Sequence, residues 1–169
     1  MSVDVRRVLR ADAAELIAAN RDGVAYHAPW ISAFTDQAGF DAWFARGVTG
    51  ANVSLLARER GSDALVGVFN LSEIVMGVFR SAYLGYWGYA PTGGRGLMTE
   101  ALRAAVRYAF DELGLHRVEA NVQPGNVRSI ALVRRAGFSR EGLSPGYLFI
   151  DGAWRDHERW ALRADAPSA

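Results

Sequence analysis

The chain contains no cysteine among its 169 residues. This absence excludes a disulfide framework, a metal site built on thiolates and catalysis by a cysteine nucleophile. An excess of one charge is also missing, because 19 basic residues oppose 18 acidic ones and leave a formal net charge of +1. Such a balance predicts no nucleic-acid partner. No apolar run has the length of a membrane span or the form of a secretion signal, which predicts a cytoplasmic protein without membrane contact.

The composition is that of an ordinary globular protein, with 50% hydrophobic and 22% charged residues. Its length suits one domain, expected over residues 1–169. Hydrophobic periodicity and turn signals predict strands at 5–11, 53–59, 64–71, 79–90, 117–123, 138–142, 147–150 and 153–162, and helices at 13–21, 37–48, 96–114 and 125–137. This order predicts an α+β fold, with a mixed, mainly antiparallel sheet flanked by helices and one β-α-β-α passage.

Single residues mark the predicted ends of these elements. Asp12 and Asp36 stand where acidic residues cap helix N-termini, and Gly114 and Gly137 stand where glycine ends helices. The Asp-Gly dipeptide at 151–152 predicts a hairpin turn between the last two strands. The aromatic-rich segment 25–35 is predicted to be a loop between the first two helices.

A glycine-rich turn, GGRG at 93–96, lies between a predicted strand and the strongest predicted helix. It lacks the lysine of a P-loop and the third glycine of a dinucleotide-binding turn. Gly94 and Gly96 would let a ligand approach the backbone, and the amides of 95–99 would lie at a helix N-terminus, which favours an anion. Arg95 adds a positive charge there. A simple turn that needs glycine only for its backbone angles is the structural alternative.

The turn resembles the acetyl-CoA-binding motif of the GNAT superfamily of N-acetyltransferases, Gln/Arg-x-x-Gly-x-Gly/Ala. The central glycine matches Gly96, whereas Gly93 and Met98 depart from the first and last positions. The segment 121–138 resembles a later motif of the ribosomal-protein-alanine (Rim-type) N-acetyltransferase branch, in which Asn-x-x-Ser is followed by a helix and Gly-Phe. Its residues here are Asn126, Ser129, Gly137 and Phe138. With further similarity in 70–86 and 147–157, the resemblance covers about 66–162.

The resemblance implies a GNAT fold in which two central strands splay apart and hold the pantetheine of acetyl-CoA between them. Acetyl-CoA is then a co-substrate, and no metal is involved. Backbone groups of Trp87, Gly88 and Tyr89 would pair with the pantetheine amides, and an amide near Trp87 and Gly88 would stabilise the oxyanion. The pyrophosphate would lie on the backbone amides of the turn and the helix start, namely those of Gly94, Arg95, Gly96, Leu97, Met98 and Thr99.

The same resemblance suggests catalytic residues. Ser129 would donate a proton to the leaving thiolate, although it could instead bond a backbone carbonyl within its helix or cap the helix. Asn126 could cap that helix and also bond the pantetheine. Glu73 is the acidic candidate for a general base, with a solvated loop carboxylate as the alternative. A base is not essential for an α-amino group, whose pKa is about 8.

These residues together predict an enzyme that transfers acetyl from acetyl-CoA directly to a primary amine in a ternary complex. The N-terminal amine of a protein, a ribosomal protein first of all, is the acceptor that the resemblance suggests. A small-molecule amine acetyltransferase and a CoA-binding regulator without turnover are the alternatives. A homodimer is left open, and no nucleic acid or membrane partner is expected.

Overall fold

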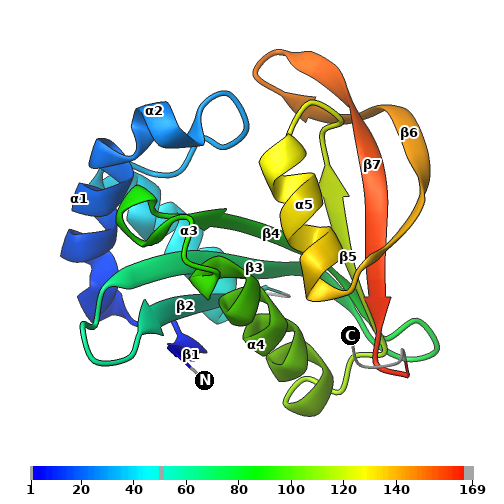
Figure 1. Cartoon of the computed structure of the whole chain (residues 1–169), viewed down its shortest axis with the longest axis horizontal. Helices are drawn as coiled ribbons and strands as arrows, with labels where there is room; N and C mark the ends of the chain where they lie inside the picture. Colours follow the sequence, from blue (N-terminus) through cyan, green and yellow to red (C-terminus); the bar gives the residue numbers. More distant parts are fainter. Residues whose placement is uncertain (1, 50–51, 166–169) are drawn as a thin grey trace.

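Seven strands form one sheet in the order β1-β2-β3-β4-β5-β7-β6. The computed structural model describes residues 2–49 and 52–165, and Figure 1 shows its elements. The strands are β1 (Val3–Arg7), β2 (Val53–Glu59), β3 (Leu65–Val75), β4 (Ser81–Gly88), β5 (Arg117–Val122), β6 (Ser139–Ile150) and β7 (Ala153–Arg163). The α-helices are α1 (Ala13–Asp22), α2 (Val24–His27), α3 (Gln37–Thr49), α4 (Leu97–Asp111) and α5 (Val127–Ala136), with 3-10 turns at Arg10–Asp12 and Ala90–Thr92.

The pairing of the strands confirms the predicted α+β fold with a mixed, mainly antiparallel sheet. Neighbouring strands are antiparallel except for β4 and β5, which are parallel. A parallel pair needs a crossover connection, and α4 supplies it. The two short strands predicted at 138–142 and 147–150 are wrong in one respect. They are parts of one strand, β6, whose register shift between Ser144 and Leu148 accommodates the Pro145-Gly146 pair that lies between them.

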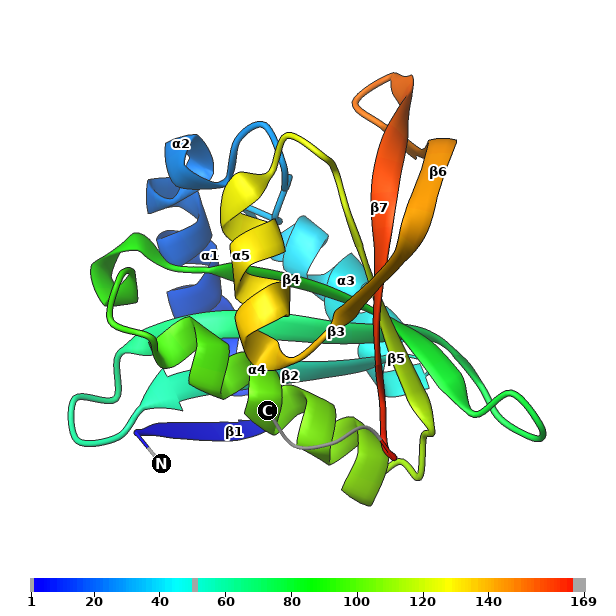
Figure 2. The same cartoon turned by 45° about the vertical axis from the view of Figure 1, so that its right-hand side comes forward.

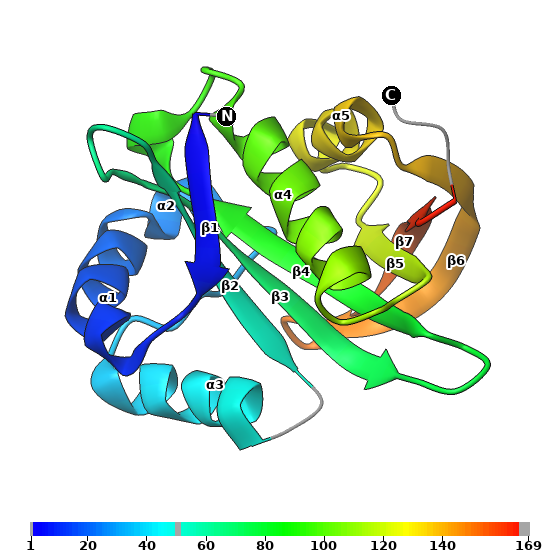
Figure 3. The ribbon, with the colours of Figure 1, turned by 90° about the horizontal axis from the view of Figure 1, so that it is seen from below.

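Helices cover the two faces of the first half of the sheet and create two cores (Figure 3). Leu55 and Leu56 are adjacent on β2, and alternation along the strand sends them to opposite faces. Leu55 joins a core with the apolar face of α4 and α5, and Leu56 joins a second core with α1 and α3. Both side chains are fully buried. Strands β2, β3 and β4 therefore contribute side chains to a core on each face of the sheet.

The helix ends follow the predicted signals in part. Asp36 Oδ1 accepts the Gly39 amide at 2.7 Å at the start of α3, as a cap should. Asp12 occupies the N-cap position of α1 without a side-chain capping bond, because its carboxylate binds Arg6 at 2.8 and 2.7 Å and the Leu9 amide at 2.7 Å. Gly137 ends α5 in the left-handed conformation, whereas α4 ends before Gly114, at Asp111.

The segment between the first two predicted helices is not entirely a loop. Its first residues form α2, and the His27 side chain is buried there, with 6% of its surface exposed. His27 Nε2–H donates to the carbonyl oxygen of Gly88 at 2.9 Å. This hydrogen bond ties the segment to the end of β4.

Among the described residues, no helix is long and apolar enough to cross a membrane.

Candidate acyl-transfer groove

The parallel strands β4 and β5 pair over only a short length. Ser81–Tyr83 pair with Arg117–Glu119, and no pairing continues beyond them. Figures 1 and 2 show β5 and β7 standing away from β4 after this point. The splayed central strands predicted from the resemblance are therefore confirmed. The opening between them exposes backbone groups that a continuous sheet would have used.

A groove with a volume of about 820 Å³ occupies this opening. Its walls come from β4, β5, the start of α5, the glycine turn, the segment around α2 and the β6–β7 hairpin. Of the predicted site residues, the groove brings together Trp87, Gly88, Gly94, Met98, Asn126 and Ser129. Its lining does not include Glu73, Tyr89, Arg95, Gly96, Leu97 or Thr99.

The backbone of β4 is divided between its neighbour β3 and the groove. The Tyr89 amide donates to the Val66 carbonyl at 3.2 Å, and Trp87 opposes Val68 in the same antiparallel ladder. Because backbone groups of successive residues point to opposite sides of a strand, Trp87 and Tyr89 face β3, and Tyr86 and Gly88 face the opening. The predicted backbone contacts of Trp87 and Tyr89 are thus taken up by the sheet. The Gly88 carbonyl accepts from His27, so the predicted contact of Gly88 stays a prediction for its amide.

The glycine turn adopts the conformation that glycine favours. Gly94 and Gly96 have φ values of +75° and +79°, and α4 starts after Gly96 without a side-chain cap. The Thr99 amide already donates to the Gly96 carbonyl at 3.0 Å as the helix begins. Arg95 binds Glu59 in a bidentate ion pair, and this hydrogen bonding lowers the pKa of Glu59. Arg95 therefore points to the end of β2 and not into the groove.

Two side chains of the first α4 turn pack beneath the groove. Leu97 is buried in the core shared with the sheet. The Met98 sulfur lies 2.8 Å from the position that a Cβ would take on Gly67, and 3.3 Å from that on Gly88. Glycine at both strand positions thus lets α4 approach β3 and β4 closely. The close approach places the start of α4 beside the open strand edge.

Asn126 and Ser129 fix the other helix start that meets the groove. Asn126 Oδ1 accepts the Ser129 amide at 3.1 Å, which is the predicted N-cap of α5. The Ser129 hydroxyl lies 2.6 Å from the hydroxyl of Tyr86 on β4. Burial raises the pKa of Tyr86 to about 12, against the lowering effect of this hydrogen bond. The structural alternatives for Ser129, a bond to its own helix or a cap by its side chain, do not describe its hydroxyl here.

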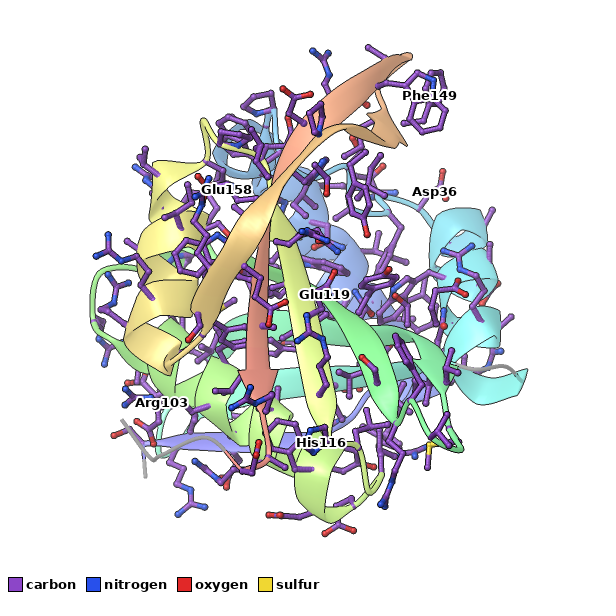
Figure 4. All side chains as sticks on the ribbon, turned by 90° about the vertical axis from the view of Figure 1, so that its right-hand side faces the viewer. Asp36, Arg103, His116, Glu119, Phe149 and Glu158 are labelled. Atoms are coloured by element: carbon purple, nitrogen blue, oxygen red, sulfur yellow. The ribbon has the colours of Figure 1, made fainter. Side chains whose placement is uncertain are left out.

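The glutamate proposed as a base lies away from the groove. Glu73 is exposed at an irregular point of β3, next to Ser72, which pairs with Tyr83 at the closed end of the opening. The acidic residue at this closed end is Glu119 of β5, which pairs with Tyr83. Its carboxylate accepts a hydrogen bond from Arg117 at 2.7 Å, and Figure 4 shows the position of Glu119. The structure therefore does not bring Glu73 together with Ser129.

The far wall of the groove contains Asn121, which the sequence patterns did not identify, and Leu148 and His157, which lie in the stretch 147–157 of the resemblance. Asn121 lines it from β5, and its side-chain oxygen is buried without a hydrogen-bond partner among the described residues. Leu148 and His157 line it from the β6–β7 hairpin, whose tip carries the exposed Phe149 (Figure 4). Alternation along β5 places Asn121 on the face opposite to that of the buried Val118, Ala120 and Val122. In the sequence, this alternation was the only indication that Asn121 could face a groove.

The segment after α2 closes one end of the groove. The Trp30 ring lies 3.0 Å from the position of a Cβ on Gly125, in the turn before α5. Trp30 and His27 both line the groove, and Phe34 packs in the core against Trp43 and Trp87 instead. Within the segment 25–35, Tyr26, His27 and Trp30 thus line the groove, whereas Phe34 does not.

Within the described part of the chain, no group of three or more acidic, histidine or cysteine residues could hold a metal ion. The chemistry that this geometry offers is hydrogen bonding along an open strand edge, an uncapped helix start and a serine–tyrosine pair.

Comparison with known proteins agrees with this geometry. Probable N-acetyltransferase YjcK of Bacillus subtilis is 42% identical over 100 residues, which are 59% of this chain and 55% of that protein. The ribosomal protein uS5-alanine N-acetyltransferase of Escherichia coli is 48% identical over 98 residues, which are 58% of this chain and 50% of that protein. The chain thus spans about half the length of these curated relatives.

A solved structure extends the similarity over the whole fold. Mycobacterium smegmatis RimJ in complex with CoA-disulfide superposes with a TM-score of 0.86 at 29% identity, over 98% of this chain and 85% of that chain. Residues 3–139 match the family described as the acetyltransferase (GNAT) domain. The chain therefore belongs to the GNAT acetyltransferase family.

Proposed function

We propose that the protein is an acetyl-CoA-dependent N-acetyltransferase that acetylates a primary amine directly, without an acetyl-enzyme intermediate. The observation that carries the proposal is the early end of β4–β5 pairing, which leaves a groove between an uncapped helix start and Ser129. The sequence contains no cysteine to carry an acetyl group. Family membership and the CoA-bound relative support the same chemistry.

The residues present fit acetyl-CoA as a co-substrate. The backbone of Tyr86 and the amide of Gly88 face the opening, where an extended pantetheine chain could add to the strand edge, whereas the Gly88 carbonyl already accepts from His27. The start of α4, with Gly94 beside it, offers backbone amides and the positive end of a helix dipole to the pyrophosphate. The amides of Arg95, Gly96, Leu97 and Met98 belong to this proposed cradle, with Thr99 at its helical end.

The transfer forms a C–N bond and breaks a C–S bond. The amine attacks the thioester carbonyl, and we propose that an amide of the β4 edge near Gly88 stabilises the oxyanion, an effect worth about 3 kcal/mol in other enzymes. Ser129, in the first turn of α5, faces the leaving sulfur in this arrangement. The proton lost by the amine nitrogen balances the proton gained by the thiolate, so no further reactant is required.

The lining of the groove favours a single, weakly basic amine as the acceptor. Over the described residues that line it there is no aspartate or glutamate, while Arg128 and Arg135 contribute positive charge. A polyamine would find no carboxylate partner there. An α-amino group, with a pKa of about 8, is partly neutral without a base, and the buried oxygen of Asn121 offers an acceptor for its N–H.

We therefore infer that the acceptor is the N-terminal amine of a protein, with a ribosomal protein first in line because a similar protein is a ribosomal-protein-alanine N-acetyltransferase. A cytoplasmic location belongs to the same proposal.

The test is an acceptor panel read out by the release of free CoA thiol. Peptides that begin with the N-terminal sequences of ribosomal proteins are compared with the same peptides blocked at the α-amine, with spermidine and with free amino acids. Turnover of the unblocked peptides alone supports the proposal. Turnover of spermidine or amino acids only would establish the small-amine alternative, and acetyl-CoA binding without any turnover would establish a regulator.

A further inference from the structure

We propose that Tyr86 is a positioning residue that sets the direction of the Ser129 hydrogen bond. Its phenol donates to Ser129 Oγ, which leaves the Ser129 O–H free to donate to the sulfur of the thioester in the groove. This inference rests on the proposed function, because it assigns a role in the departure of CoA. Tyr86 lies at the end of the matched stretch 70–86, but no sequence pattern assigns it a role; its part emerges from the 2.6 Å contact between the two hydroxyls.

The tyrosine ring and the serine backbone on either side of this contact are each held by a neighbour. The Tyr86 ring packs against the fully buried Phe69, with 6.1 Å between the ring centroids. The Ser129 backbone is held by Asn126 Oδ1. The bond therefore joins β4 to the first turn of α5.

The direction of the hydrogen bond follows from the chemistry of the two groups. A phenol is a stronger donor than an alkyl hydroxyl, and an alkyl hydroxyl is the stronger acceptor. Ser129 is the one side-chain partner of the Tyr86 hydroxyl among the described residues. Because burial raises the pKa of Tyr86 to about 12, the phenol keeps its proton throughout the neutral range.

A correctly directed Ser129 stabilises the sulfur as the C–S bond breaks. The electron pair of that bond goes to sulfur, and a hydrogen bond to a charged group is stronger than one between neutral groups. Ser129 does not need to lose its proton, since the amine nitrogen releases the proton that the thiolate finally takes up. Tyr86 thus acts through Ser129 and has no contact with the acceptor in this scheme.

Kinetics of four variants test the assignment. Tyr86→Phe removes only the hydroxyl, and we expect kcat to fall about tenfold, with little change in the KM for acetyl-CoA. Ser129→Ala and the double variant complete a cycle, in which the loss of Tyr86 should cost nothing further once Ser129 is absent. Tyr83→Phe is the matched control, because Tyr83 is on the same strand and its hydroxyl contacts Tyr147, 3.3 Å away, outside the groove.

A second measurement does not depend on turnover. The pKa of the CoA thiol, followed by the ultraviolet absorbance of the thiolate, should fall on binding to the unmodified protein. Tyr86→Phe and Ser129→Ala should both raise it again by about one unit. Far-ultraviolet circular dichroism confirms that each variant is folded.

Specific results would overturn the inference. An unchanged kcat in Tyr86→Phe, or a loss of rate in the Ser129→Ala background as well, would show that Tyr86 does not act through Ser129. An equal thiol pKa in the unmodified protein and in Tyr86→Phe would do the same. If CoA binds and the thiol shift appears without turnover of any amine, the transferase proposal fails and the role in CoA departure fails with it, whereas the hydrogen bond from Ser129 to the bound sulfur, directed by Tyr86, is retained.

Discussion

Two helices begin at the same groove, and they begin in opposite ways. Helix α4 starts after Gly96 with no side-chain cap, whereas α5 starts after Asn126, whose side chain accepts the Ser129 amide. An uncapped start leaves backbone donors available for an anion, at some expense in local stability. A capped start is stable and can hold a side chain at a constant position. The difference matches the division of labour proposed for the two ends, phosphate binding at one and departure of the thiolate at the other.

Their surroundings strengthen this contrast. Near α4, the charged side chain Arg95 is paired with Glu59 and directed away, so the turn offers backbone and not side chains. Near α5, the Tyr86 hydroxyl reaches the helix from β4. One site is formed by local chain conformation, and the other by a contact between distant segments.

The largest effect is expected at the uncapped start. Gly96→Trp should weaken acetyl-CoA binding at least about a hundredfold by calorimetry, because a bulky residue covers the amides and resists the left-handed conformation. Gly77→Trp is the matched control, since Gly77 has φ +74° and, like Gly96, nothing within 4 Å of the position that a Cβ would take. Equal losses of affinity in both variants would show that the turn holds no phosphate.

At the capped start, Ser129→Ala should reduce kcat about fiftyfold and leave the dissociation constant of acetyl-CoA nearly unchanged. The reason is that the hydroxyl is proposed to bind the sulfur strongly only when it becomes a thiolate. Steady-state kinetics and calorimetry on the same samples measure the two quantities. A parallel loss of affinity and rate would instead indicate a binding role for Ser129.

The free energy of unfolding at alkaline pH depends on two tyrosines near the starts of α4 and α5. Burial raises the pKa of Tyr86, beside α5, and of Tyr89, before the α4 turn, to about 12. The unfolded chain releases these protons near pH 10, so the free energy of unfolding is fully retained below pH 10 and falls between about pH 10 and 12. Tyr86→Phe should flatten this decline by about 1 to 2 kcal/mol in denaturant titrations. A slope equal to that of the unmodified protein would contradict the burial of Tyr86.

Removal of the Asn126 cap of α5 is expected to have a smaller effect, on the free energy of unfolding. Asn126→Ala should lower the free energy of unfolding by about 1 kcal/mol, because the Ser129 amide loses its acceptor. Asn126→Asp keeps an acceptor at the same place and serves as the control in urea unfolding. No difference between the two variants would mean that the cap adds nothing to α5.

The smallest effect concerns Arg95. Because it is held by Glu59 at an exposed position, Arg95→Gln should weaken acetyl-CoA binding only about twofold to threefold, through the loss of a general positive charge. Calorimetry at low and high salt measures this. A much larger loss would show that Arg95 leaves Glu59 to bind the phosphates, and the α4 start would then resemble the α5 start in using a side chain.

Several features were predictable because they depend on neighbours within one turn or one strand. The positive φ at Gly96, the cap at Asn126 and the end of α5 at Gly137 follow from side-chain size and from donors three or four residues away. The sheet class follows from the spacing of apolar residues. The positions of Gly94, Met98 and Ser129 along one groove could be expected through the resemblance.

Features that depend on strand pairing and register could not be predicted from such local sequence patterns. The exposure of Glu73 at the closed end of the opening depends on the pairing of Ser72 with Tyr83. The commitment of the Tyr89 amide to β3 depends on strand register, which shifts every backbone group when it moves by one residue.

The sequence by itself determined where α3 and α5 begin, where α5 ends, which strand faces are apolar, and that a glycine turn precedes α4, because these are local consequences of side-chain shape and hydrogen bonding. Only the tertiary structure decided that β4 and β5 separate after Tyr83, that Arg95 turns to Glu59, and that Tyr86 meets Ser129. The two residues of that last pair are 43 positions apart, and their contact exists only once α5 packs beside the open edge of β4. The glycines before α4 already indicated its uncapped start in the sequence. The role proposed for the capped start of α5 follows only from the contact of Ser129 with Tyr86.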